Sequence, residues 1–307
     1  MKMLSRCPQT LTACVTALLL TGAAMTPAWA ATSSKSPDDR AIQAAPVEQP
    51  VTPQPATSAD GTQSLPSGDE IARRINARDD GVSVVRSMTM ELLDKRGKKR
   101  TRKTRSFRKY FETEKRIAIF FQKPRNVRDT AFLTFDYLED GEEDAQWLYL
   151  PALRRVRRIS GSDRGDYFMG TDFTYDDIRQ DTKVSRSDYV RTTLGMDEVD
   201  GRACYMVEAV PANEDVAEQL GYSRTLSCVD AEIWMVLKSE IWDLQGNALK
   251  TIYTREIREV QGIWTAHRLE AENHKTGHKT TFIISEVDYL ADLGDDLFTR
   301  SALKRGL

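Results

Sequence analysis

The stretch WLYLPALRRVRRISGSDRGDYFMGTDFTYDD, residues 147–177, joins a polar-aromatic strand, an arginine run, a Ser/Gly turn and an aromatic segment with carboxylates. Side chains two residues apart on a strand share a face, so Trp147 and Tyr149 point the same way. If the strand continues past Pro151, arginines occupy both of its faces, at Arg154, Arg155, Arg157 and Arg158. Such a strand is poorly suited to a dry core, and we expect it to border water, an anionic ligand or a partner.

The N-terminus has the pattern of a secretory signal peptide. A basic start with Lys2 and Arg6 precedes an apolar run over residues 13–24 and the cleavage signal Ala28-Trp29-Ala30. We therefore expect cleavage after Ala30 and a periplasmic mature protein. Residues 31–66 are rich in Ala, Pro, Gln, Ser and Thr and poor in large apolar residues, which predicts a disordered tether.

The remaining chain, residues 67–307, is predicted to be one folded domain. The S-x-x-E pattern from Ser67 to Glu70 indicates the start of a short helix. Alternating apolar residues and turn signals then predict strands, over residues 82–92, 101–111, 116–122, 130–137, 146–150, 183–191, 203–209, 223–229, 233–242, 248–260, 263–273 and 279–289. Two more short helices are predicted over residues 212–220 and 295–304.

Short connections between successive strands favour an antiparallel meander. The predicted fold class is α+β, with a strongly curved sheet or half-open barrel of about 10–12 strands and a few short helices against its concave side. The strand over residues 233–242 has apolar side chains on both faces, including Trp234 and Trp242 on one of them. Such a strand needs cover on both sides or borders a cavity.

The motifs of several enzyme classes are absent from the sequence. It contains no G-x-S-x-G, G-x-G-x-x-G, Walker A, H-E-x-x-H or C-x-x-C pattern. His274 and His278 flank a turn and could gather a metal with Glu272, but a solvated hairpin pair is the simpler interpretation. Asp172 and Asp176 could act as paired carboxylates in a hydrolase, although helix-capping acids fit the same pattern better. We expect no enzyme, no cofactor and no metal.

The most basic run is KRGKKRTRKTRSFRK, from Lys95 to Lys109. Nucleic acid is an unsuitable partner for an exported chain, so no nucleic acid is expected. Three interpretations stay open: an anionic membrane surface, an acidic protein, or an edge hairpin made basic to prevent aggregation.

Cys204 and Cys228 are the two cysteines that follow the predicted cleavage site. In an oxidising compartment a pair of cysteines on neighbouring strands tends to form a disulfide. Two buried small hydrophobic side chains are the alternative.

The central stretch resembles the signature of the outer-membrane lipoprotein-sorting protein family, LolA-like periplasmic proteins often associated with exporters of the resistance-nodulation-division (RND) type. The run from Trp147 to Ile159 and the run from Phe168 to Asp177 carry the resemblance. It continues at residues 201–205, 246–250 and 277–280, and covers about residues 67–307. Cys228 departs from the pattern, which has a large apolar or aromatic residue there, and the long tether is also unusual.

The resemblance implies a half-open antiparallel barrel whose helices cover an apolar cavity for acyl chains of lipids or lipoproteins. It also implies that an inner-membrane RND-type transporter or an acceptor docks on the basic surface and the arginine strand, with residues 168–177 as a mobile lid. Candidate cavity residues are Met88, Met90, Trp147, Tyr149, Phe168, Met169, Phe173, Trp234 and Trp242. Candidate docking residues are Arg154, Arg155, Arg157, Arg158, Asp172, Tyr175 and Asp176.

Two functions from different classes follow from these expectations. The first is a carrier that passes lipids or lipoproteins between an RND-type exporter and the outer membrane. The second is a non-carrier accessory subunit that docks on such a transporter and regulates it. An apolar cavity favours the first, because burying acyl chains requires one.

Overall fold

The structure, a computed structural model, describes residues 64–137 and 144–307. The predicted signal peptide and almost all of the predicted tether lie outside the described residues. Where the description begins, Ser67 caps the first helix by accepting a hydrogen bond from the Glu70 backbone N–H. The S-x-x-E pattern therefore marks the start of this helix.

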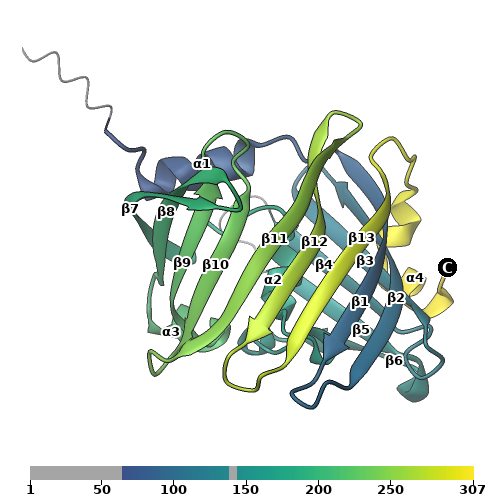
Figure 1. Cartoon of the computed structure of the whole chain (residues 1–307). Helices are drawn as coiled ribbons and strands as arrows, with labels where there is room; N and C mark the ends of the chain where they lie inside the picture. The colour runs from purple at the N-terminus through teal and green to yellow at the C-terminus, as the bar shows by residue number, and fades with distance from the viewer. Residues whose placement is uncertain (1–63, 138–143) are drawn as a thin grey trace, which may run out of the picture. The chain divides into compact units, whose positions relative to one another are not determined.

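In the described residues, thirteen antiparallel strands form a single curved, unclosed sheet, in the order β6-β5-β4-β3-β2-β1-β13-β12-β11-β10-β9-β8-β7 (Figure 1). The strands are β1 (Ser83–Leu93), β2 (Lys99–Tyr110), β3 (Glu114–Lys123), β4 (Ala131–Tyr137), β5 (Ala145–Leu150), β6 (Arg155–Ile159), β7 (Tyr189–Val199), β8 (Arg202–Pro211), β9 (Tyr222–Asp230), β10 (Val236–Asp243), β11 (Ala248–Val260), β12 (Ile263–Asn273) and β13 (Lys279–Asp288). The first and last strands of the chain, β1 and β13, pair in the middle of the sheet. The edges are therefore β6 and β7, and the predicted half-open barrel is confirmed.

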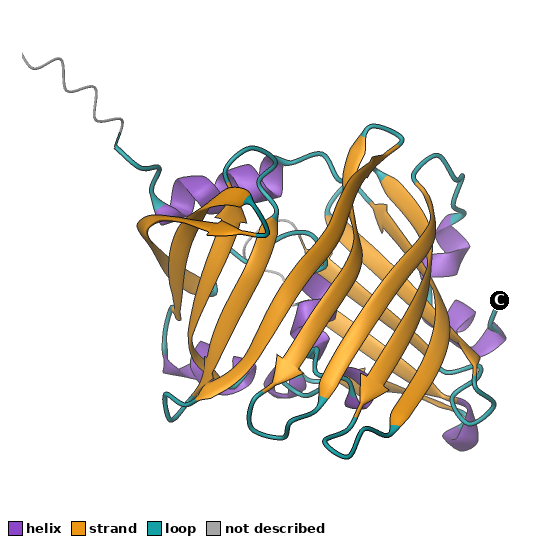
Figure 2. Ribbon diagram, in the orientation of Figure 1, coloured by secondary structure: helices purple, strands orange, loops and turns teal. Residues whose placement is uncertain are grey.

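The helices are short and lie on both faces of the sheet (Figure 2). They are α1 (Gly68–Ala77), η1 (Pro151–Leu153), η2 (Gly161–Asp163), η3 (Phe168–Gly170), α2 (Tyr175–Gln180), α3 (Glu214–Leu220), η4 (Asp295–Phe298) and α4 (Arg300–Arg305). α1, η3 and α2 cover the concave face. η4 and α4 pack instead on the opposite face, where Phe298 and Leu303 join the buried cluster of Phe107, Phe120 and Leu133. None of the helices in the described residues is long and apolar enough to span a membrane.

Three predicted strand details differ from the structure. The strand expected over residues 183–191 is a loop up to Asp188, and β7 then continues to Val199. Trp234 lies in a turn with φ of 54°, before β10 begins at Val236. Val82, expected on the buried face of β1, is 72% exposed, because the strand starts one residue later, at Ser83, and leaves Val82 outside the sheet.

α1 lies directly on the edge strand β7. A Cβ atom added at Gly68 would come within 2.6 Å of the Arg191 Cβ and 2.7 Å of the Arg191 backbone carbon. Only glycine permits this close approach. The helix is thereby seated over the concave face of β7 to β10, with Ile71 and Ile75 packed against Val207 and Val229.

Cys204 on β8 and Cys228 on β9 form a disulfide. Both side chains are buried, together with Leu237 of β10. Because Ile241 of the same strand lines the concave face, β10 does carry apolar side chains on both of its faces.

Candidate functional site

The concave face contains two regions, one filled by packed side chains and one that contains a pocket. One lies over β1, β3, β4 and β13, where residues Phe168–Asp177 pack against the concave face. We call this segment the plug. The other lies over β8 to β11 beneath α1. The plug includes η3 and the start of α2, and Figure 1 shows α2 within the curve of the sheet.

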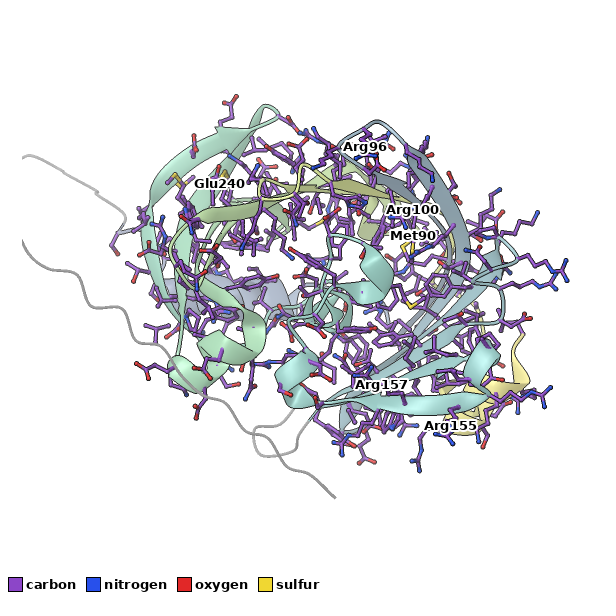
Figure 3. All side chains as sticks on the ribbon, turned by 90° about the horizontal axis from the view of Figure 1, so that it is seen from below. Met90, Arg96, Arg100, Arg155, Arg157 and Glu240 are labelled. Carbon is purple, nitrogen blue, oxygen red and sulfur yellow. A yellow bond between two sulfur atoms is a disulfide. The ribbon has the colours of Figure 1, made fainter. Side chains whose placement is uncertain are left out.

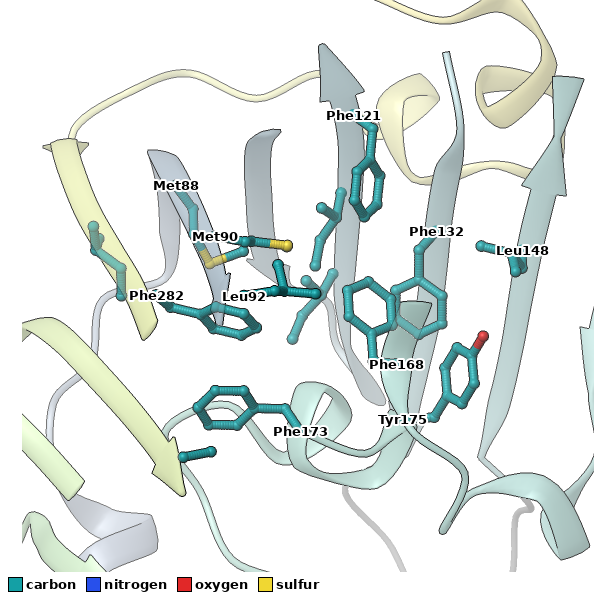
Figure 4. Packing of buried hydrophobic residues seen from close by; sticks show 14 of the residues in the cluster. Met88, Met90, Leu92, Phe121, Phe132, Leu148, Phe168, Phe173, Tyr175 and Phe282 are labelled. Atoms are coloured by element: carbon teal, nitrogen blue, oxygen red, sulfur yellow. The ribbon is translucent and has the colours of Figure 1, made fainter. Parts of the chain in front are cut away.

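Aromatic side chains of the plug fill the first region (Figure 4). Phe168 is completely buried, with its ring centroid 5.1 Å from that of Phe132 and 6.1 Å from that of Phe121. Phe173 stacks on Phe282 of β13 at 4.3 Å. The predicted cavity residues Met88 and Met90 belong to the same cluster, as do Leu92, Ile117, Ile119, Leu148 and Ile284. This region is a packed core rather than an open cavity.

Polar contacts hold the plug at its centre. The Asp172 carboxylate accepts a hydrogen bond from Thr280 Oγ1 at 2.6 Å and lies 2.5 Å from His278 Nδ1. Lys250 Nζ, whose side chain is fully buried, lies 2.7 Å from Asp177 Oδ2 and 3.2 Å from the Asp172 carbonyl oxygen. Arg102 adds a hydrogen bond of 2.6 Å to the Met169 carbonyl. The mobile lid that the resemblance implied is thus buried and fixed by ionic contacts in this conformation.

A buried ionic network holds the end of the plug. Arg179 donates to Asp176 at 2.8 Å, contacts Asp144 at 2.6 Å and also pairs with Asp136. Burial by itself would raise the pKa of the Asp176 carboxyl, but the guanidinium groups of Arg179 and Arg164 hold it below its ordinary value. Burial raises the pKa of Asp144, and the nearby Asp136 carboxylate adds to the effect.

The second region contains a pocket of about 140 Å³. Its apolar lining comes from α1 and from the inward side chains of β8, β9, β10 and β11, among them Ile71, Ile75, Val207, Val229, Ile241 and Ile252. Ala209 also faces it, while Ser227 and Ser239 hydrogen-bond to each other at 2.8 Å along its wall. At about 30 Å³ per small group, the pocket accommodates roughly five methylene groups.

A larger polar cleft of about 730 Å³ adjoins this pocket. Its described lining includes Lys115, Gln146, Arg164, Arg179 and Asp188, and it shares Gln180 and Val184 with the apolar pocket. The Gln146 side-chain carbonyl is buried and has no hydrogen-bond partner among residues 64–137 and 144–307. An apolar pocket beside a polar cleft suits a molecule with an apolar tail and a polar head.

The nine predicted cavity residues do not form one cavity. Met88, Met90, Phe168, Met169 and Phe173 meet in the packed cluster. Trp147 and Tyr149 lie on the other face of the sheet, near α4, because β5 alternates its side chains between faces. Trp234 stacks on Tyr205 at 5.6 Å, and Trp242 lies under the Arg224 guanidinium at 3.9 Å. None of these nine side chains is among the described residues that line the apolar pocket.

The predicted docking residues divide into two groups. Arg154, Arg155, Arg157 and Arg158 are exposed on or just before the edge strand β6, although Arg154 lies in a left-handed turn rather than on the strand. Asp172, Tyr175 and Asp176 are 3%, 8% and 2% exposed. Their burial within the plug differs from the expectation that they contact a partner at the surface.

The histidines serve as hydrogen-bonding groups. His278, expected to be solvated, is mostly buried and pairs with Asp172. His274 Nε2 lies 2.8 Å from Thr251 Oγ1, and His267 Nδ1 lies 3.0 Å from the Ile284 carbonyl. The described residues contain no group of three His, Cys, Asp or Glu side chains arranged to hold a metal ion.

The residues that line the pocket were not identified from the sequence. Their signal was present: Ile71, Ala72 and Ile75 form one face of α1, and Val207 and Ala209 alternate along β8. The prediction instead chose large aromatic residues as cavity residues. It missed the pocket lining because large side chains fill a packed core more often than they line a pocket.

Comparisons with known proteins agree with this fold. A family model, described only as that of an uncharacterized protein, matches residues 113–305. No curated protein matches the chain.

Among solved structures, the chain is similar to a domain classed with the outer membrane lipoprotein-sorting proteins, from Vibrio parahaemolyticus. The identity is 30% and the TM-score 0.70, over 78% of this chain and 98% of that domain. A DUF1329 family protein from Desulfovibrio piger shares 28% identity with a TM-score of 0.71, over 77% and 97% of the two chains. A LolA superfamily protein from Nitrosomonas europaea, at 18% identity and a TM-score of 0.58 over 78% and 100%, shares the fold. The chain therefore belongs to the outer membrane lipoprotein-sorting protein family and has its LolA-like half-barrel.

Proposed function

We propose that this protein is a periplasmic carrier that binds acyl chains of lipids or lipoproteins in the apolar pocket beneath α1. It passes them between an inner-membrane RND-type exporter and the outer membrane. Family membership supports the carrier class, and the signal-peptide pattern with cleavage after Ala30 supports the compartment. The mature chain would comprise the tether of residues 31–66 and the carrier domain of residues 67–307, without enzymatic activity.

The apolar pocket and its polar neighbour carry this proposal. Transfer of one methylene group from water to an apolar site is worth about 0.8 kcal/mol, so five groups contribute roughly 4 kcal/mol. The polar cleft that shares Gln180 and Val184 would keep the head group hydrated. A complete acyl chain needs more room, which displacement of α1 or of the plug would provide.

α1 is the element whose displacement would enlarge the pocket. It contributes Ile71, Ala72 and Ile75 to the lining. Its last turn is held by Asn76, which exchanges two hydrogen bonds of 2.9 Å with the backbone of Val184. Since Val184 lies at the border with the polar cleft, a head group entering there would compete for these contacts.

The test is native mass spectrometry of the mature protein, purified without detergent and then extracted with organic solvent. Wild type should retain an acyl-chain species. Ala209→Phe, which fills the pocket from β8, should lose it. Ala203→Phe is the matched control, because Ala203 lies on the same strand but is exposed. Wild type without ligand, even after incubation with lipids, would contradict the proposal.

The exposed arginines of the β6 edge favour a second candidate function, the non-carrier accessory subunit of an RND-type transporter. Arg154, Arg155 and Arg157 would then bind acidic side chains of the transporter. Reversal of these three charges should abolish capture of the transporter while leaving lipid content unchanged. Retained capture would count against this candidate.

A further inference from the structure

Six strand connections lie at one end of the sheet, and four of them form a group on the β6 side; the other two, β8–β9 with the acidic helix α3 and β10–β11, lie towards the β7 edge. β1–β2, β3–β4, β5–β6 and β12–β13 are antiparallel pairs in a continuous sheet, so their connections lie at the same end. The lower rim in Figure 1 shows them together. A Cβ atom at Gly277, in the β12–β13 connection, would lie 3.5 Å from the Lys95 Cβ in the β1–β2 connection.

These four connections are strongly basic; we call them the basic end. They carry Lys95, Arg96, Lys98, Arg125, Arg128, Arg154 and Lys275, against Asp94 and Asp129. The Asp94 carboxylate is already engaged, since Oδ1 accepts hydrogen bonds of 2.9 Å from the backbone N–H groups of Arg96 and Lys98. Figure 3 views this end and shows Arg96, Arg100, Arg155 and Arg157 around it.

Most cations of the basic end have no ion-pair partner in the part of the chain that the structure describes. This holds for Lys95, Arg96, Lys98, Arg125 and Arg154, all of which are exposed. Arg128 contacts Asp129 only at 3.7 Å, and Lys275 contacts Asp243 only at 3.9 Å. Mutual repulsion of so many like charges is a cost that an anionic partner would remove.

Two leucines extend from the same end. Leu153, in the β5–β6 connection, is 63% exposed, and Leu93, at the end of β1, is 38% exposed. Apolar side chains surrounded by Lys and Arg are typical of surfaces that lie on a bilayer, where the cations meet head groups and the apolar groups enter the acyl boundary.

We propose that the basic end is a docking surface for an anionic lipid bilayer. Its cations are spread over four separate turns rather than gathered in a concave site, which suits a broad, laterally mobile charge better than the fixed carboxylates of one protein partner. The buried face of the plug is tied to this end through Arg102, which follows the β1–β2 connection and binds the Met169 carbonyl. Docking would thus bring the membrane next to the plug.

Vesicle co-sedimentation of the mature protein tests the surface. Vesicles of phosphatidylcholine with about one quarter phosphatidylglycerol should bind it at about 0.1 M salt, and phosphatidylcholine alone should not. The variant Lys95→Glu, Arg96→Glu, Lys98→Glu should bind about 100-fold more weakly. The control Arg73→Glu, Arg258→Glu, Lys304→Glu changes the net charge equally at exposed positions elsewhere and should bind like wild type.

Two further variants separate the alternatives. Leu153→Ser should weaken vesicle binding by about 5-fold, because its side chain enters the bilayer. Ala209→Phe should bind vesicles as wild type does, because the basic end acts independently of the pocket. A failure of the docking proposal can therefore be told apart from a failure of the carrier proposal. Equal binding of the two triple variants, or no binding of wild type to anionic vesicles, would overturn the proposal and leave an acidic protein or solvent as the partner of this end.

Discussion

Under the plug, Phe168 and Phe173 fill the concave face of the sheet, whereas under α1 the same sheet leaves a pocket of about 140 Å³. The difference lies in the side chains that cover each region. The plug inserts aromatic rings and fixes them with Asp172, Lys250 and Arg179. α1 offers only Ile71, Ala72 and Ile75 over a wall of small residues such as Ala209 and Ser227.

This contrast assigns different tasks to the two regions. A packed aromatic core with buried ion pairs provides stability and a fixed geometry. The pocket beneath α1 has mostly small and aliphatic walls, with Asp176 and Asp177 of the plug at its border, and it can be filled from β8 without removing the aromatic rings of the plug. We therefore expect that substitutions in the pocket mainly change ligand binding, and that substitutions in the plug mainly change the free energy of unfolding.

The largest expected effect comes from Phe168→Ala. Removing a fully buried ring that contacts three aromatic neighbours should lower the free energy of unfolding by about 3–5 kcal/mol. Ile75→Ala enlarges a pocket that already exists and should cost about 2 kcal/mol. Urea denaturation measures both, and an equal loss would show that the two regions are packed alike.

Loss of the disulfide should act on the pocket region alone. Cys204 and Cys228 are 24 residues apart in the sequence, and closing a loop of this size stabilises by about 3 kcal/mol. In Cys204→Ser, Cys228→Ser, amide hydrogen exchange should accelerate in β8 and β9. Faster exchange in the plug would mean that the two regions unfold as one.

Lys250 joins the plug to β11 and should matter less, because its partner Asp177 is 22% exposed. Lys250→Met should lower the free energy of unfolding by about 2 kcal/mol. Adding Asp177→Asn should restore part of that loss, since the double variant leaves no unpaired charge. Additive losses in denaturation experiments would show that the pair is not coupled.

The smallest effect is the pH dependence of the plug. The pKa of Asp176 is lowered in the folded state, so its contribution is present above the unfolded value of about 4 and is lost as pH falls through the folded pKa. Asp176→Asn should reduce the loss of stability between about pH 5 and pH 2 by about 1 kcal/mol. Asp197→Asn, a substitution at an exposed position, is the control. If the free energy of unfolding of Asp176→Asn depends on pH as steeply as that of wild type and of the control, Asp176 does not have the role assigned to it.

Much of the fold could be predicted from the sequence, because alternation and turn residues are local signals. The hairpin at Asp200-Gly201 and the helix ending at Gly221 are examples. The division of the concave face depends on contacts between distant segments. Nothing near Asp172 in the sequence indicates His278 or Thr280 as partners, so the plug could be read as a mobile, partner-binding segment.

The candidate site was harder to predict for a related reason. Trp147 and Phe168 look alike as apolar candidates, yet one lies near α4 on the outer face and the other in the inner core. A pocket forms where side chains from several elements are too short to touch one another. A sequence pattern does not show which side chains will face each other at such a distance. Small residues such as Ala209 gain their significance only once the strands are placed.

The most direct test of the central claim compares the lipid content of wild type, Ala209→Phe and Ala203→Phe by native mass spectrometry. If the region beneath α1 holds acyl chains, wild type and Ala203→Phe carry the same bound species and Ala209→Phe carries none, while all three unfold at similar urea concentrations. A folded Ala209→Phe variant that retains the full complement of lipid would contradict this account and move the ligand away from the pocket.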